Sequence, residues 1–209
     1  MQDVATSEGR EIKRPDICIS INSEHLDPLA QEFLKSLKPD GFVTARTTHG
    51  NLFAGVEWLM PTAVVLYLMH TFFGAMISEA GKDTYKRLKS SAVTLYGRTS
   101  PLKISLIATA GKVEEVPRYS LGYSIVVPTS QELIFKFLIQ PGLSQDQASE
   151  AIWAFFDLML AFADGTITPD VLHRLEQGRA VSRTLLLAYD FELRSIVTVD
   201  PLPNAPNVK

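Results

Sequence analysis

The sequence predicts an α+β protein in which a mixed or antiparallel sheet packs around one long central helix, with two or three shorter helices beside it. Segments with period-two alternation come in runs, with few β-α-β alternations, which favours this class. One stretch without a strong breaker, residues 61–96, is long enough for the central helix. Of the 209 residues, 46% are hydrophobic and 21% are charged, a balance typical of a globular chain that buries a core.

We expect a single domain over residues 15–200, because no flexible linker divides this part of the chain. Residues 1–14 are polar and mixed in charge, which predicts a flexible arm, and residues 201–209 predict a flexible tail. A division into two subdomains near residue 100 is the alternative.

The overall charge and the cysteine content limit the cellular compartment and the kinds of partner that the sequence predicts. A formal net charge of -3 and an isoelectric point near 5.8 give no support for nucleic-acid binding, which usually needs a basic face. Cys18 is the single cysteine, so no internal disulfide can form, as is typical of a reducing compartment. The N-terminus is polar and does not resemble a secretory signal peptide. These observations predict a soluble, cytoplasmic protein.

The first elements after the arm are a strand and a helix. Residues 16–22 alternate apolar and polar side chains, which predicts a half-buried strand. Asp27 and Pro28 then open a helix, with the Asp27 carboxylate expected to accept from N–H groups of the first turn. Two further short strands are expected at residues 42–48 and 51–58.

The helix expected over residues 61–96 changes character along its length. Its first half is apolar on every side, and its second half is amphipathic and basic. Pro61 suits the first turn and Gly97 suits the C-terminal stop. Gly74 or Gly81 is expected to bend or divide this helix, at a cost of about 1 kcal/mol each relative to Ala.

The second half of the chain predicts more strands before its helices. Strands are expected at residues 102–108 and 121–127. Residues 132–140 lie between Pro128 and Pro141, which favours a third strand of a meander, and a helix remains the alternative for this segment.

The clearest helix signal begins at Ser144, which forms a capping box with Gln147 at the start of residues 144–162. The remaining expected elements are a short helix and a pair of strands, at residues 168–177, 183–189 and 196–199.

The chain contains no sequence motif for a phosphate loop, a dinucleotide site, a nucleophile elbow or a zinc site. No two of its histidines are spaced as a local metal pair; they are His25, His49, His70 and His173. We therefore expect no cofactor and no metal, and the sequence favours a function without catalysis.

The sharpest local asymmetry is a basic segment, residues 82–103, which holds six basic residues against one acid. Lys82, Lys86 and Lys89 recur at helical spacing and therefore share one face. Together with Arg87 they predict a surface that binds an anion or an acidic partner. A solvated outer face of a packed helix is the alternative interpretation.

Two polar residues lie in apolar surroundings. His70 is either a ligand or pH switch, or a core histidine that donates to a backbone carbonyl. Asp157 is either one of a carboxylate pair with Asp164, with a pKa raised by partial burial, or an edge residue that meets a lysine.

These features predict a non-enzymatic interaction or regulatory protein, an adaptor or immunity-type module that binds a protein partner or a second copy of itself. The first alternative is a membrane-associating or membrane-inserting effector that uses the apolar run at residues 58–77 and the basic face at residues 82–89. The second alternative is an enzyme whose site is assembled from residues distant in sequence, with Cys18, Glu57, His70 and Asp157 as candidates.

Overall fold

The structure is a computed structural model in which seven strands form one sheet and five α-helices pack beside it, so the predicted α+β class is confirmed. A 3₁₀ turn, Glu24–Leu26, is the remaining helical element within the described ranges. The residues that the structure describes are 15–37, 44–48, 62–76, 79–102, 118–129 and 133–201.

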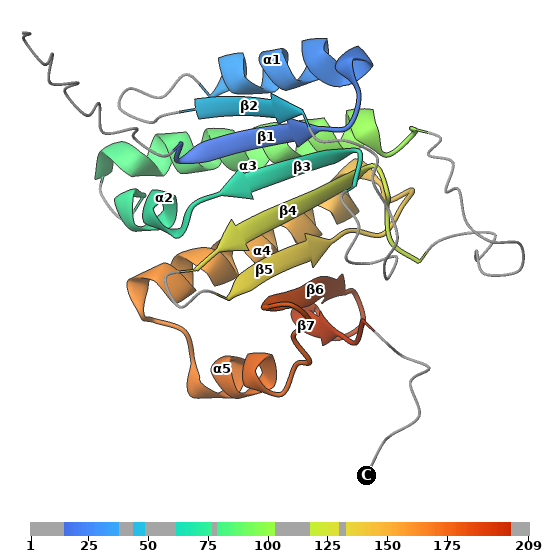
Figure 1. Cartoon of the computed structure of the whole chain (residues 1–209). Coiled ribbons are helices and arrows are strands. Elements are labelled where there is room, and N and C mark those ends of the chain that lie inside the picture. Colours follow the sequence, from blue (N-terminus) through green and yellow to red (C-terminus); the bar gives the residue numbers. More distant parts are fainter. Residues whose placement is uncertain are drawn as a thin grey trace, which may run out of the picture.

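The sheet is mixed. Its strands are β1 (Ile17–Ile21), β2 (Thr44–Thr48), β3 (Val64–Leu68), β4 (Tyr123–Pro128), β5 (Ile134–Leu138), β6 (Thr184–Asp190) and β7 (Ser195–Val199). They lie in the order β2-β1-β3-β4-β5-β6-β7 (Figure 1). The pairs β1–β2, β3–β4 and β5–β6 are parallel, and the pairs β1–β3, β4–β5 and β6–β7 are antiparallel.

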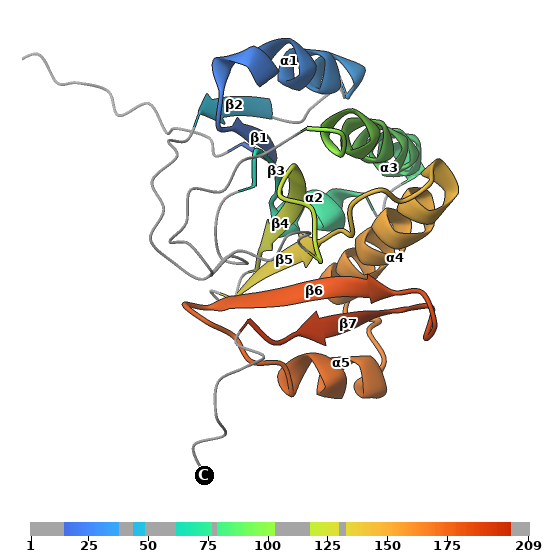
Figure 2. The ribbon, with the colours of Figure 1, turned by 90° about the vertical axis from the view of Figure 1, so that its right-hand side faces the viewer.

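The helices are α1 (Asp27–Ser36), α2 (His70–Ala75), α3 (Glu79–Thr99), α4 (Gln145–Asp164) and α5 (Pro169–Glu176). In chain order α1 lies between the strands of the first parallel pair, α2 and α3 between those of the second, and α4 and α5 between those of the third. The fold therefore contains three β-α-β units side by side. Figure 2 shows α1, α3 and α4 on one face of the sheet, with α5 beside β7 at one end.

The main core lies between the sheet and its helix layer. One row of buried, mutually paired residues crosses five strands, and the aromatic ring on β5 stacks on Phe155 of α4 with centroids 4.5 Å apart. The row consists of Ile19, Leu66, Ile125, Phe137 and Leu187.

The opposite face of the sheet is also largely buried along its central strands. The neighbouring row on this face pairs Cys18 with Tyr67, Tyr67 with Val126 and Val126 with Lys136. A smaller apolar cluster extends this face toward the edge and includes Leu186. Both faces of the central strands are therefore packed, which places the sheet in the interior of the fold.

The expectation of a helix over residues 61–96, bent or divided at Gly74 or Gly81, is wrong in its first part. Residues 64–68 form β3, which pairs with β1 on one side and β4 on the other. A strand buried on both faces is apolar at every position, so its pattern cannot be told from that of a buried helix. The long helix is α3, which spans 21 residues from Glu79 to Thr99.

The same finding bears on the membrane alternative, because the apolar run at residues 58–77 contains β3 and does not form one helix. Among the described residues, no single helix has the length and apolar character needed to cross a bilayer. In the described part of the chain, α4 and α5 taken together have both, and they are bent by 104° where they meet.

Most other elements agree with the sequence pattern. Residues 132–140 contain a strand, β5, rather than a helix, and the Ser144–Gln147 capping box is present at the start of α4. The predicted strand pair near the C-terminus is the antiparallel pair β6–β7. The expectation of few β-α-β alternations is wrong, because the interpretation of residues 64–68 as helix concealed the second β-α-β unit.

Asp27 does not cap α1 as predicted, since the N-cap is Leu26. The Asp27 carboxylate instead accepts from the side chain of Gln31 at 3.0 Å and forms an ion pair with Arg46 of β2. The strands expected at residues 51–58 and 102–108 lie in segments that are almost entirely outside the described residues, as do the arm and most of the tail.

Candidate functional site

The exposed side chain of Trp153 lies on α4 at its boundary with α3, and 43% of its surface is accessible. The Nζ of Lys89 on α3 lies 5.7 Å from the centroid of the Trp153 ring and 4.7 Å from the centroid of the Tyr85 ring. A cation over an aromatic face is attracted by the ring quadrupole. Lys89 therefore lies over the Trp153 ring from the neighbouring helix.

Asp157 fixes this arrangement from α4. Its Oδ1 accepts from the Nζ of Lys89 at 2.5 Å and from the Oη of Tyr85 at 2.9 Å. Burial, together with the negative charge and hydrogen bond of Asp157, raises the pKa of the Tyr85 hydroxyl well above its ordinary value. Tyr85 therefore remains a proton donor to Asp157 throughout the neutral range.

These contacts bear on the two interpretations of Asp157. The carboxylate meets a lysine, as the structural alternative expected, and it does so at the edge of the apolar stripe of α4. Lys89 is likewise engaged within the chain, since its side chain is only 13% exposed and is paired with Asp157. Its positive charge on this surface is therefore already paired with Asp157.

The other basic residues of the predicted surface are exposed on α3. Lys82 and Lys86 precede Lys89 at helical spacing and lie on the face turned toward α4. Arg87 is two residues from Lys89 and therefore points away from this face. The predicted basic surface thus keeps Lys82 and Lys86 beside α4, whereas Arg87 is separated from them.

The outer stripe of α4 has the opposite charge. Asp157 and Asp164 follow Trp153 at helical spacing, and both are exposed. The sequence of α4 contains no Lys or Arg. We name the combined outer stripes the α3–α4 surface and define it by Lys82, Lys86, Lys89, Trp153, Asp157 and Asp164.

The residues proposed for a dispersed catalytic site do not come together. Cys18 lies on the face of the sheet opposite the helix layer that carries Asp157, so the sheet separates them. Burial raises the pKa of the Cys18 thiol, which disfavours the reactive thiolate. His70 is the half-buried first residue of α2, and Glu57 lies outside the described residues.

Two residues that the sequence analysis did not single out prove distinctive. Trp153 falls outside the apolar stripe of α4, and a helical projection of the sequence carries this signal. Lys136 is 6% exposed on β5, and burial lowers the pKa of its amine to about 8. In the sequence, Lys136 stands out as a lone charged residue within an apolar strand. On the same face of the sheet, the hydroxyls of Thr62 and Ser124 are 2.6 Å apart and buried.

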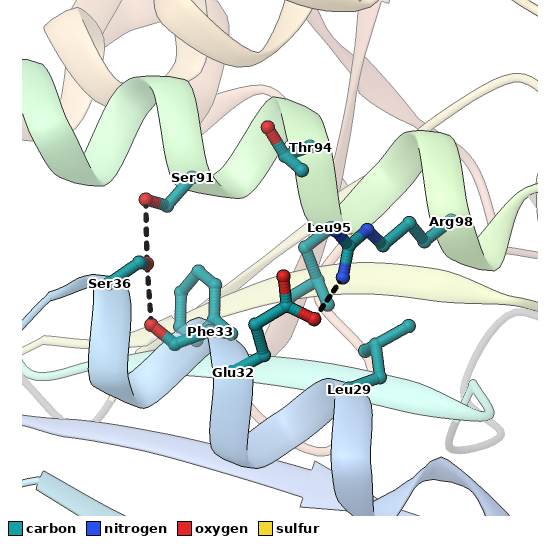
Figure 3. Close-up of a pocket in the computed structure, with 8 residues that line it drawn as sticks. All are labelled: Leu29, Glu32, Phe33, Ser36, Ser91, Thr94, Leu95 and Arg98. Atoms are coloured by element: carbon teal, nitrogen blue, oxygen red, sulfur yellow. Dashed lines mark hydrogen bonds and ion pairs between the residues drawn. The ribbon is translucent and has the colours of Figure 1, made fainter.

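A shallow groove lies between α1 and α3 (Figure 3). Arg98 reaches across it to Glu32, and Ser36 and Ser91 close it with a hydrogen bond of 2.9 Å. Its volume is about 120 Å³, well below the roughly 300 Å³ at which small-molecule sites begin. The groove therefore reflects imperfect packing between two helices, bridged by polar contacts, and does not favour a small-molecule site.

Within the described ranges, no three His, Cys, Asp or Glu side chains lie close enough together to hold a metal ion. No protein family, curated protein or solved structure matches this chain. The α3–α4 surface is therefore the candidate that the geometry itself supports.

Proposed function

We propose that this protein is a non-enzymatic interaction module, adaptor or regulatory in role, that binds a protein partner through the α3–α4 surface. The observation that carries the proposal is the exposed indole of Trp153, held beneath Lys89 on a well-packed helix. Tryptophan is strongly enriched among the few residues that dominate binding free energy at protein interfaces.

The side chains beside Trp153 already contact one another within the chain. Lys89 and Tyr85 both donate to Asp157, and Tyr85 also packs edge-on against the buried Phe156 with ring centroids 6.2 Å apart. Ordering rotamer-rich side chains on binding costs about 0.5–1.5 kcal/mol each. Because these contacts already exist, a partner of the α3–α4 surface avoids much of that cost.

The charge pattern favours a protein over a membrane or a nucleic acid. Lys82 and Lys86 would attract an anionic surface, but Asp157 and Asp164 lie beside them and would be repelled by it. A protein can present both signs at the matching positions. We place this interaction in the cytoplasm, on the strength of the single cysteine.

An enzymatic role receives less support, because the candidate groups are distributed over separate parts of the fold. Cys18 and Asp157 lie on opposite sides of the sheet, and the groove between α1 and α3 contains neither. The geometry offers no nucleophile and base within reach of each other at these positions.

The test is a comparison of proteins captured from the native cells by the full chain and by two variants. Trp153→Ala removes the proposed anchor, and Leu193→Ala removes another exposed apolar side chain, 66% accessible, in the turn between β6 and β7. We expect a partner that the wild type and Leu193→Ala retain and Trp153→Ala loses, with affinity reduced about 30-fold or more. Equal capture by Trp153→Ala would show that binding occurs elsewhere on the molecule.

A further inference from the structure

We draw no further inference here: the strongest candidate, the side-chain cluster of Trp153, Lys89 and Asp157 on the α3–α4 surface, belongs to the site already described, and nothing in the described part of the structure shows what covers it.

Discussion

Lys136 is a basic residue in a buried position, 6% exposed on β5. It lies on the sheet face away from the helix layer, where it pairs with Val126 on β4 and Leu186 on β6. Removal from water disfavours a charged amine, so burial lowers the pKa of Lys136 from 10.5 to about 8. An unfolded chain would hold this proton at least until the ordinary lysine range. The two states therefore bind different numbers of protons at mildly alkaline pH.

The sign of the resulting pH dependence follows from this difference. Above about pH 8 the folded chain has lost the Lys136 proton while the unfolded chain retains it, so folding stability rises with pH until the unfolded pKa is reached. We predict that the free energy of unfolding of the wild type rises by about 1 kcal/mol between about pH 7.5 and pH 9, relative to Lys136→Met. Urea denaturation at the two pH values measures the difference.

The matched control for this prediction is Lys35→Met, which removes an exposed lysine from α1. Its stability should follow the wild-type pH dependence. Cys18, whose pKa is raised by burial, acts in the opposite direction at higher pH, but it does so in all three proteins and cancels from the comparison. A wild type and a Lys136→Met variant with parallel pH profiles would contradict the assignment of a lowered pKa to Lys136.

At the residue scale, the sequence reveals which charged side chains share a face more readily than it reveals which side chains contact each other. The shared face of Lys82, Lys86 and Lys89 follows from spacing alone, because helical periodicity fixes it. The partner of Lys89 does not follow, since Asp157 lies on another helix 68 residues away. Trp153 was detectable as an aromatic residue off the apolar stripe of its helix. Whether it was covered by another element depended on tertiary packing.

At the scale of elements, local signals succeeded wherever chain neighbours determine the structure. The capping box at Ser144 is such a signal, with the Gln147 side chain and backbone both satisfied within three residues. The prediction for the residues of β3 was wrong for the converse reason. Its apolar residues are explained by the strands on both sides and by the layers above and below, none of which is local in sequence.

Gly81 lies near the junction between α2 and α3, where there is no space for a side chain. A Cβ at this position would lie 2.6 Å from the Cα of Met76 and 2.7 Å from the carbonyl oxygen of Ala75. We predict that Gly81→Ala destabilises the protein by about 1–3 kcal/mol, because the overpacking outweighs the gain in helix propensity. The midpoint of urea unfolding provides the measurement.

Gly97 offers a control in the same helix, since a Cβ there would meet no atom within 4 Å. Gly97→Ala should stabilise the protein by about 0.5–1 kcal/mol, the ordinary gain from replacing a helical glycine. If Gly81→Ala were stabilising to the same extent, the close approach of the α2–α3 junction would be disproved.

At the scale of the whole molecule, the sheet order was not accessible from the sequence. The predicted class and the mixed sheet are present, but the pairing of β1 with β3 and of β3 with β4 links segments far apart in the chain. No local pattern specifies which strand lies beside which. The continuity of the sheet across residue 100 also depends on β3, which the sequence pattern had concealed.

The shared core makes a prediction about cooperativity. Phe155 on α4 is fully buried and stacks on Phe137, in the row that continues to Ile19 of β1. We expect Phe155→Ala to destabilise the whole molecule by about 3–5 kcal/mol while unfolding remains a single transition. Native-state hydrogen exchange should show the β1 amides losing the same protection as those of β5. Unchanged protection in β1 would instead support two subdomains that divide near residue 100.

The outermost pair of strands has a mechanical consequence. β7 pairs only with β6 among the described strands, and its final residue, Val199, lies opposite Leu186 near the start of β6. The bonds between antiparallel strands are perpendicular to the chain, so tension on the C-terminal side would load them one after another rather than together. Pulling from that side would separate β7 from β6 one residue pair at a time. A molecular motor that draws the chain in from its C-terminal side would therefore meet β7 first, at an edge of the sheet.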